Sequence, residues 1–500
     1  MGQAPVTPRP AKEVPSWTLT AEHARKTQGL VVSGFNHLPW AQALFLRLDA
    51  PGGAWLQTVQ RLAPVSDATG KSSRACALAF TCTGLTRMGL GDALATFATP
   101  FQEGMHQEDR RRRLGDDART VVAGGPAWSG NAHDEPQTPD LVHALLLLYD
   151  NDEADAASWA DAVALALQPG VAVVRRIGLD LQLDHRHLAR EHFGFTDGLS
   201  QPAPYGDEVV LTNGRKVTRD RWHGIPCGDI LMGHINAHHE PAPGPYIPDP
   251  GPAVRPPDLL PDGAPEGFLN FGLDGTYMVV RELRQYAAAF WQSLEQGAAA
   301  IRARDPAATH VTPLWLAERI IGRDIDGHLL CPSGAMAALK NGLPNNGIGF
   351  IHNDPHSHGC PAGSHVRRAN PRDGLAKDVA DAQTLLDAAN NHRILRRGRK
   401  YGPKVEDPST DDGRDRGLLF MCLNTDLVRQ FEFIQQTWLL NQNFATLFDE
   451  TDPLVGPKGT FTIGEKPLRR IVEVDTFVKL AGGEYFFLPS LPALAYLATL

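Results

Sequence analysis

The stretch "GCPAGSHVRRANPR", from Gly359 to Arg372, places a single histidine, His365, between a Cys-Pro-Ala-Gly turn and three arginines. Three interpretations fit a histidine in so cationic a setting. The first is a surface loop that binds phosphate. The second is a zinc loop built from the donors just upstream, His352, His356, His358 and Cys360, although their spacing matches no established zinc pattern. In the third, His365 ligates iron beside a large dianionic cofactor whose charge the arginines neutralise.

The bulk composition narrows the class of protein. The chain has 500 residues, of which 42% are hydrophobic and 21% charged, as is usual for a globular protein. This length exceeds one ordinary core, so two domains or one large duplicated domain is expected. The formal charge of -9 argues against a nucleic-acid partner, because such binders are normally basic.

Targeting signals and cysteine spacing bear on location and cofactor attachment. The N-terminus lacks the uninterrupted apolar core of a signal peptide and has no twin-arginine pair, and no window approaches 18 apolar residues. We therefore expect a cytoplasmic protein with no membrane partner. The six cysteines are scattered, without CxxC or CxxCH, which predicts reduced core residues and argues against a covalently attached c-type haem.

The order of predicted elements indicates an α+β fold. Apolar strands alternate with helical segments in the first half, and an antiparallel sheet with helices on one face fits this order best. A proline-rich loop, 236–267, cannot form helix or central strand. After it, Asp274-Gly275 predicts a hairpin turn. The predicted strands are 41–50, 75–84, 140–151, 171–183, 276–283, 416–426 and 482–491, and the clearest predicted helices are 153–167 and 285–304.

Two further stretches carry candidate functional side chains. In "FGFTDGLSQP", Phe193 to Pro202, the glycines around Asp197 predict a tight turn that presents one carboxylate. "HRILRRGRKYG", His392 to Gly402, is a short apolar segment that ends in two arginines and a turn. Taken alone, the first is most simply a turn aspartate and the second a solvated cationic face.

Together with the opening stretch, these segments resemble the dye-decolorizing (DyP-type) haem peroxidases. "FGFTDG" resembles the GxxDG signature of that family, "CPAGSHVRRANPR" the segment that carries its haem-ligating histidine, and "ILRRGRKYG" its distal arginine segment. "CGDILMGHIN", "DGTYMVVREL" and "GGEYFFLPSL" agree as well, so the resemblance covers roughly residues 28–498. The chain looks like the longer, cytoplasmic members.

The resemblance implies an α+β fold of two ferredoxin-like halves with antiparallel sheets and flanking helices. Non-covalent haem b is then expected between sheet and helices, mainly of the C-terminal half. The implied division of the chain is a flexible tail, 1–27, an N-terminal domain with the GxxDG motif, 28–220, and a C-terminal domain with the proximal haem ligand and the proline-rich loop, 221–500.

The implied function is that of a haem peroxidase, which uses hydrogen peroxide to oxidise dyes, phenolics or other small organic reductants through a ferryl intermediate. His365 would be the axial ligand of the haem iron. Asp197 would take a proton from the bound oxygen and return it to the departing one, and Arg396 would stabilise the charge on that oxygen. An aspartate base predicts activity on the acid side of neutral.

The resemblance also implies supporting residues. Arg372 is the first choice and Arg367 the second for pairing with a haem propionate. Asp426, in "CLNTDLV", is the candidate carboxylate that accepts the second N–H of His365. Because "RRGRKYG" departs from the usual motif, whether Arg396 or Arg397 faces the iron stays open. Surface aromatic residues relay electrons in the family, and the candidates here are Trp438, Tyr401 and Tyr485.

Two other functions remain as alternatives: a haem-handling protein with little turnover, and a non-haem zinc-binding interaction protein that uses the cluster around His356. Asp197 and Arg396 favour the peroxidase over the haem-handling protein, because binding alone needs neither. The sequence leaves open the natural reductant and whether the protein is a monomer or a homodimer.

Overall fold

The computed structural model describes residues 19–70, 72–130, 140–184, 188–204, 222–331, 349–466 and 469–500, and the backbone of four short strands, Glu208–Val210, Lys216–Thr218, Leu339–Lys340 and Leu343–Pro344. Within the span predicted as a flexible tail, a helix, α1, covers Ala21–Lys26. Residues 1–18 and the predicted domain boundary after residue 220 lie outside the described residues, so the proposed domain limits stay a prediction.

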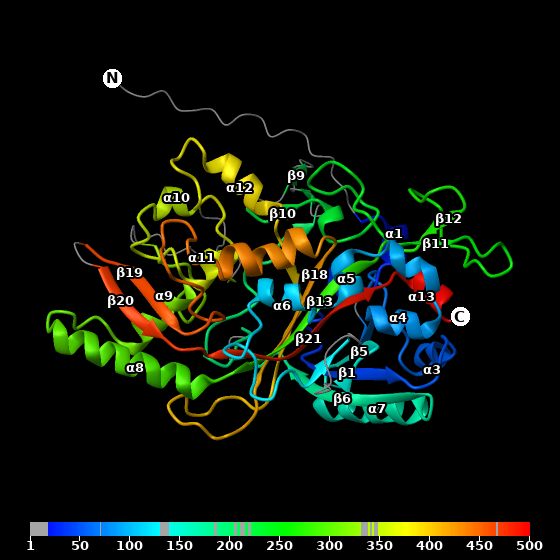
Figure 1. The fold of residues 1–500 in the computed structure, drawn as a ribbon, viewed down its shortest axis with the longest axis horizontal. Helices are drawn as coiled ribbons and strands as arrows, with labels where there is room; N and C mark the ends of the chain where they lie inside the picture. Colours follow the sequence, from blue (N-terminus) through cyan, green and yellow to red (C-terminus); the bar gives the residue numbers. More distant parts are fainter. Residues whose placement is uncertain are drawn as a thin grey trace.

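A single closed ring of antiparallel strands joins the two halves of the chain (Figure 1). The neighbour order is β13–β18–β17–β6–β1–β5–β2–β21, and β21 pairs again with β13. The halves meet at two seams, where Lys400 lies opposite Asp180 and Phe80 lies opposite Phe487. The strands are β1 (Trp40–Leu48), β2 (Arg74–Phe80), β5 (Ala144–Asp150), β6 (Val171–Asp180), β13 (Thr276–Gln285), β17 (Arg399–Tyr401), β18 (Gly417–Asn424) and β21 (Val478–Leu488).

Alternation along these strands separates the inside of the ring from its outside. Successive side chains of a strand point to opposite faces. Ala43 of β1, Met278 of β13 and Met421 of β18 belong to one buried cluster although their strands lie on different sides of the ring. That cluster therefore fills the inside, and the intervening residues of each strand face outward.

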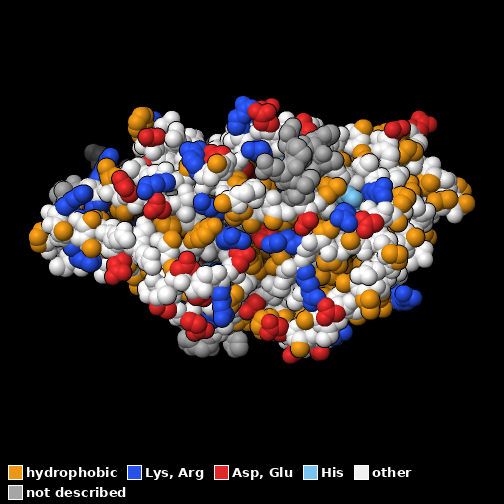
Figure 2. Space-filling view, turned by 60° about the horizontal axis from the view of Figure 1, so that its bottom comes forward, with side chains coloured by type: hydrophobic (Ala, Val, Ile, Leu, Met, Phe, Trp, Pro, Cys, Tyr) orange, Lys and Arg blue, Asp and Glu red, His pale blue; other side chains and the backbone are white. Residues whose placement is uncertain are grey.

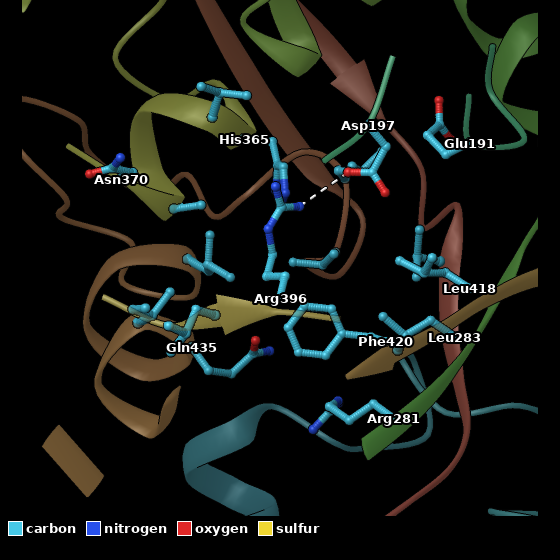
Figure 3. A pocket seen from close by; sticks show the side chains of 18 of the residues that line it. Glu191, Asp197, Arg281, Leu283, His365, Asn370, Arg396, Leu418, Phe420 and Gln435 are labelled. Carbon is cyan, nitrogen blue, oxygen red and sulfur yellow. Dashed lines mark hydrogen bonds and ion pairs between the residues drawn. The ribbon is translucent and has the colours of Figure 1, made fainter. Parts of the chain in front are cut away.

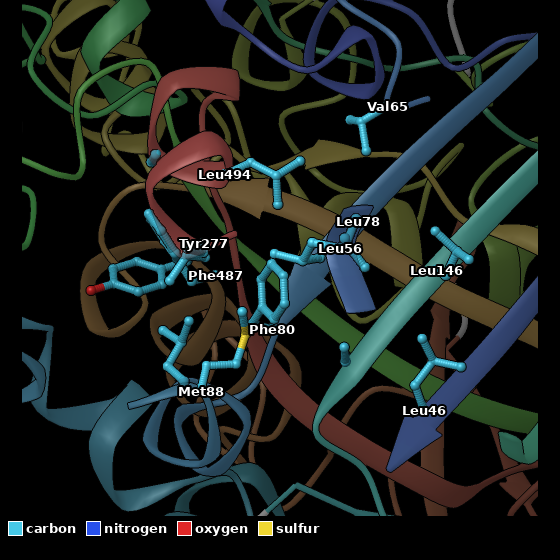
Figure 4. Packing of buried hydrophobic residues seen from close by; sticks show 14 of the residues in the cluster. Leu46, Leu56, Val65, Leu78, Phe80, Met88, Leu146, Tyr277, Phe487 and Leu494 are labelled. Carbon is cyan, nitrogen blue, oxygen red and sulfur yellow. The ribbon is translucent and has the colours of Figure 1, made fainter. Parts of the chain in front are cut away.

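In the described part of the chain, a layer of helices covers the outer face of the N-terminal half. Leu46, Leu78, Phe80 and Phe487 point from the strands into this layer, where they pack with helical side chains such as Leu494 (Figure 4). The longest of these helices begins directly after its N-cap, Asp152, whose carboxylate accepts the backbone N–H of Asp155. These helices include α3 (Trp55–Leu62), α4 (Cys82–Met88), α7 (Glu153–Leu167) and α13 (Leu491–Leu497), and α7 confirms the helix predicted over 153–167.

The outer face of β13 and β18 carries a different layer. A separate apolar cluster joins two helices, α8 (Ala287–Arg304) and α9 (Pro313–Ile321), to a hairpin of β19 (Gly459–Gly464) and β20 (Arg469–Val474). A short helix, α11 (His365–Ala369), and two consecutive π-helical segments, η3 (Val428–Glu432) and η4 (Ile434–Leu439), complete this layer. π-Helical turns are rare and often occur at functional sites.

The structure corrects two predicted elements and confirms the α+β class. The Asp274-Gly275 hairpin is wrong: β12 (Phe268–Asn270) pairs with β11 (Tyr246–Pro248) inside the proline-rich segment, whereas β13 pairs with β18 and β21. The turn itself exists, with Asp274 at a φ of 60°. The strand predicted over 75–84 ends at Phe80, because Thr81 caps α4 by accepting the backbone N–H of Gly84.

The surface charges and the apolar character of the helices bear on nucleic-acid and membrane partners. On the face shown in Figure 2, basic and acidic side chains are interspersed rather than gathered by sign. Among the described helices, none combines the length and apolar character needed to cross a bilayer. The cytoplasmic location stays a prediction.

Candidate active site

A cavity lies against the outer face of β13 and β18, beneath α11 and the π-helical segments (Figure 3). Its floor consists of two cross-strand pairs, Arg281 opposite Phe420 and Leu283 opposite Leu418. These residues alternate with the ring-filling side chains, so strand geometry alone turns them toward the cavity. His365, Asp197 and Arg396 all line this cavity, although they come from separate segments of the chain.

His365 is the first residue of α11 and follows the N-cap Ser364. Its Nδ1 lies 3.0 Å from Oδ2 of Asp452, a buried carboxylate that also accepts the backbone N–H groups of Leu454 and Val455. Burial lowers the pKa of His365, but the Asp452 charge and hydrogen bond outweigh it, so the pKa is raised overall. Because Nδ1 donates to Asp452, Nε2 is the nitrogen available to a ligand in the cavity.

Asp426 does not take the role predicted for it. Its carboxylate accepts the backbone N–H of Arg429 and lies 3.8 Å from the Arg429 side chain. The partner of His365 is instead Asp452, which stands 87 positions further along the chain. No motif in the sequence marks Asp452, so only the folded contact identifies it.

Asp197 stands in the predicted tight turn. Gly194 and Gly198 adopt positive φ angles of 97° and 77°, which favour glycine. The Asp197 Oδ1 accepts the backbone N–H of Gly198 at 2.6 Å and an Nη1 hydrogen of Arg396 at 3.1 Å. Burial raises the pKa of Asp197, but the charges of Arg396 and Lys400 outweigh this, so the pKa is lowered overall. The carboxylate is therefore ionised at neutral pH.

The structure distinguishes the two candidate arginines. Leu395 and Arg396 form a short strand, β16, against β18, with Leu395 in the ring-filling cluster and Arg396 turned outward to the cavity. Arg397 points the other way and donates to the backbone carbonyls of Leu30 and Val31. Arg396 is thus the arginine beside Asp197.

Of the two predicted propionate partners, only Arg372 lines the cavity. Arg367 points away, donating to the Cys360 carbonyl at 2.9 Å and to Asp354 at 3.3 Å, so that prediction is wrong. Arg323, which the sequence did not single out, lines the cavity instead. Burial, and next the charge of Arg372, lower the pKa of Arg323 to about 9. Two guanidinium groups therefore lie close enough to repel, which a dianionic ligand would relieve.

Glu191 is a second carboxyl group in the cavity wall that sequence reasoning missed. It accepts the backbone N–H groups of Phe193 and Phe195 and the side-chain amide of Gln285. Burial, with a smaller contribution from Asp197, raises the pKa of Glu191 to about 7. Glu191 therefore holds a proton on the acid side of neutral, while Asp197 nearby is ionised.

The rival zinc cluster does not assemble. The Cys360 thiol lies 3.0 Å from the Ser364 hydroxyl, and burial raises its pKa. In the described part of the chain, potential metal-ligand atoms converge elsewhere. That convergence does not include His352, His356, His358 or Cys360.

The aromatic residues predicted as surface electron relays are not at the surface. Trp438, Tyr401 and Tyr485 are all buried. The Tyr485 hydroxyl donates to the Glu432 carboxylate at 2.7 Å, and its ring lies 6.4 Å from that of Phe431, which lines the cavity. A relay at any of these three positions would need a further residue to reach solvent.

The chemistry of the cavity wall fits a haem. One imidazole is oriented through Nδ1 with Nε2 left for iron, and the floor offers aliphatic and aromatic side chains to a flat apolar ring. Arg372 and Arg323 suit two propionates. These features come from different segments of the chain, which makes a chance match of this donor set improbable.

Comparisons with known proteins show what the whole chain is similar to. No protein-family model matches the chain. A dye-decolorizing peroxidase of Mycena epipterygia is 26% identical over 461 residues, covering 84% of this chain and 75% of that protein. A dye-decolorizing peroxidase of Auricularia auricula-judae is 25% identical over 442 residues, covering 83% and 74%. The crystal structure of a DyP-type peroxidase from Anabaena sp. superposes with a TM-score of 0.71 at 24% identity, covering 95% of each chain. This structural likeness shows the fold, and the likeness in sequence extends over most of the chain.

Proposed function

The chain belongs to the dye-decolorizing peroxidase family, and on this premise we propose that His365, Asp197 and Arg396 form its peroxide-reacting centre. One observation carries the proposal: an oriented histidine and an aspartate–arginine ion pair line the same cavity. The substrates are hydrogen peroxide and organic reductants, with dyes and phenolics as the proposed classes.

Haem b, held without a covalent bond, would supply the iron chemistry for cleavage of peroxide. Nε2 of His365 would ligate that iron, and Arg372 and Arg323 would pair with the propionates. Asp452 accepts the Nδ1 proton, which fixes the tautomer and makes the imidazole a stronger electron donor.

Asp197 moves the proton that the reaction requires. Its carboxylate takes a proton from one oxygen of hydrogen peroxide and returns it to the other oxygen, which leaves as water. The base must be ionised at the start, and the lowered pKa of Asp197 preserves that form as the pH falls. This supports the proposed activity on the acid side of neutral.

Arg396 has two tasks in the proposal. Its guanidinium orients the Asp197 carboxylate through the 3.1 Å hydrogen bond. Its charge also stabilises the negative charge that develops on the departing oxygen, as an oxyanion hole does. Passive haem binding would need neither residue, so the ion pair supports turnover over haem handling.

Substitution of neighbouring arginines tests this assignment. We expect Arg396→Leu to lower kcat/KM for hydrogen peroxide by about 10²–10³-fold, because the charge on the departing oxygen loses its partner. Arg397→Lys is the matched control, since Arg397 faces backbone carbonyls outside the cavity. The measurement is steady-state, peroxide-dependent oxidation of a phenol by protein with equal haem content. Equal losses in both variants would refute the role of Arg396.

A further inference from the structure

Three potential metal ligands converge at the end of β13 that lies away from the cavity. Oδ2 of Asp274 is 2.8 Å from Nδ1 of His23, and Oδ1 is 2.6 Å from Nε2 of His234. The candidate ligand atoms of His23, His234 and Asp274 all lie within 4.8 Å of one another, and among the described residues these three side chains form the candidate metal-binding group. Asp274 precedes β13, and Arg281 in the cavity floor follows on that strand. At the rise per residue of a β-strand, the two residues are roughly 20 Å apart.

The backbone holds these three side chains in place. His23 belongs to α1, whose N-cap Thr20 accepts the backbone N–H of His23. The segments of His234 and Asp274 are fastened to each other, because Met232 N–H donates to the Gly275 carbonyl and Asp274 N–H donates to the Met232 carbonyl. Figure 1 shows α1 far from α11, so the cluster is independent of the peroxide-reacting centre.

The charge balance of the cluster favours a cation. Asp274 and His234 are each 1% exposed, and in the described part of the chain both ion-pair partners of Asp274 are imidazoles. Nearby Lys26 pairs directly with Glu22 at 2.8 Å, and its charge acts on Asp274 only from outside hydrogen-bond contact. A buried carboxylate is costly unless a positive charge compensates it. A divalent ion would provide that charge while both imidazoles stay neutral.

The ring geometry also suits one shared ion. The His23 and His234 ring centroids are 4.8 Å apart at an interplanar angle of 70°. Two imidazoles on one tetrahedral zinc ion, at about 2 Å each, hold their centroids about 5 Å apart. The His23 side chain is 24% exposed, which leaves an opening through which an ion and a fourth, water ligand could enter.

We propose that His23, His234 and Asp274 bind a divalent transition-metal ion, of which zinc fits the donor set best. The ion would fasten α1 to the start of β13 and to the loop of His234, three segments that are distant in sequence. Two imidazoles and one carboxylate, with a solvent position left open, form an established zinc donor set.

Calorimetric titration with zinc chloride tests the proposal on the full, haem-loaded chain after dialysis against a chelator. The porphyrin retains its iron during dialysis against the chelator, so zinc can be titrated into protein that still carries haem. We expect one zinc per chain, and a loss of affinity of at least about tenfold in His23→Ala and in Asp274→Asn. Asparagine tolerates the positive φ of Asp274, so that variant keeps the turn. His356→Ala, which removes an exposed imidazole elsewhere, should bind zinc like the wild type.

Thermal unfolding provides a second readout. Zinc should raise the melting temperature of the wild type and of His356→Ala but not that of Asp274→Asn, because an ion that binds only the folded chain stabilises it. If the wild type binds no zinc, or if Asp274→Asn and His23→Ala bind it as tightly as the wild type, the proposal is wrong. The cluster would then be two imidazoles hydrogen-bonded to one carboxylate, and the peroxidase assignment would be unaffected.

Discussion

Asp452 accepts a hydrogen bond from Nδ1 of His365 at 3.0 Å and is itself held by two backbone N–H groups. Such a partner fixes the tautomer of a metal-ligating histidine and strengthens its bond to the metal. In the proposed centre, the strength of the bond between His365 and iron would therefore depend on a residue that touches neither peroxide nor reductant.

We expect Asp452→Asn to weaken haem retention about 10–100-fold, because the Nδ1 proton loses a charged acceptor. Asp426→Asn is the control, since Asp426 bonds to Arg429 instead. The transfer of haem to an excess of apomyoglobin, followed by absorbance, measures the difference. Unchanged transfer from Asp452→Asn, or equally fast transfer from Asp426→Asn, would contradict the assignment.

Sequence alone singled out His365, Asp197 and Arg396, which the fold brings to one cavity, because each sits in a short local motif. It could not locate Asp452, which meets His365 only through the fold. It also misassigned Arg367, and helix geometry explains why. Arg367 lies two residues after His365 on α11, and side chains two apart on a helix do not share a face.

At the level of single elements, the two-residue alternation of strands assigns side chains to the cavity or to the ring. On β18, Leu418 lines the cavity and Leu419 joins the cluster inside the ring. The same rule turns Arg396 outward and Leu395 inward on β16. Strand registration against β18 thus settles a choice that the arginine-rich motif left open.

Leu419→Ala should lower the free energy of unfolding by about 2–5 kcal/mol, because Leu419 is fully buried and its removal leaves a cavity. Leu418→Ala should cost clearly less, since Leu418 borders a space that already exists. Urea denaturation of the two variants at equal haem content compares them. A larger loss for Leu418→Ala would show that Leu418, and not Leu419, points to the inside of the ring.

Composition made one helix predictable, because α7 over Glu153–Leu167 is rich in alanine, the strongest helix former. The strand pairing at Asp274-Gly275 could not be predicted in this way. A turn motif reports local backbone geometry but does not specify which strands pair. Here β13 pairs with β18 and β21, both far along the chain. A search for metal ligands by spacing also fails at this turn, since His23, His234 and Asp274 come from three distant segments.

At the scale of the whole molecule, the two halves form one closed ring rather than two separate sheets. The α+β class followed from the order of strands and helices. Ring closure did not, because the seams at Lys400–Asp180 and Phe80–Phe487 join residues that no local pattern connects. The cavity depends on this closure, since β16 and β18 of one half meet the turn of Asp197 from the other.

The stability of the folded chain should depend on the protonation of Glu191. Its pKa is raised to about 7 in the folded state, so the native protein holds this proton more tightly than the unfolded chain does. Its contribution to stability is therefore fully present below the ordinary glutamate pKa and is lost as the pH rises toward 7. We expect the loss to be on the order of 1–3 kcal/mol.

Glu191→Gln removes this titration and should flatten the decline between pH 4.5 and pH 7. Urea unfolding of both proteins across this range gives the comparison. An identical pH dependence in the wild type and in Glu191→Gln would show that Glu191 is ionised throughout and that its burial has no such effect.

The most direct test of the peroxide-reacting centre is rapid mixing of the haem-loaded protein with one equivalent of hydrogen peroxide, followed through the Soret band. We predict that Asp197→Asn slows the spectral change by about 10²–10⁴-fold, because the proton has no acceptor. Asp161→Asn, which alters an exposed carboxylate on α7, should react like the wild type. If Asp197→Asn reacts with peroxide as fast as the wild type, Asp197 is not the proton carrier and the proposed centre is wrong.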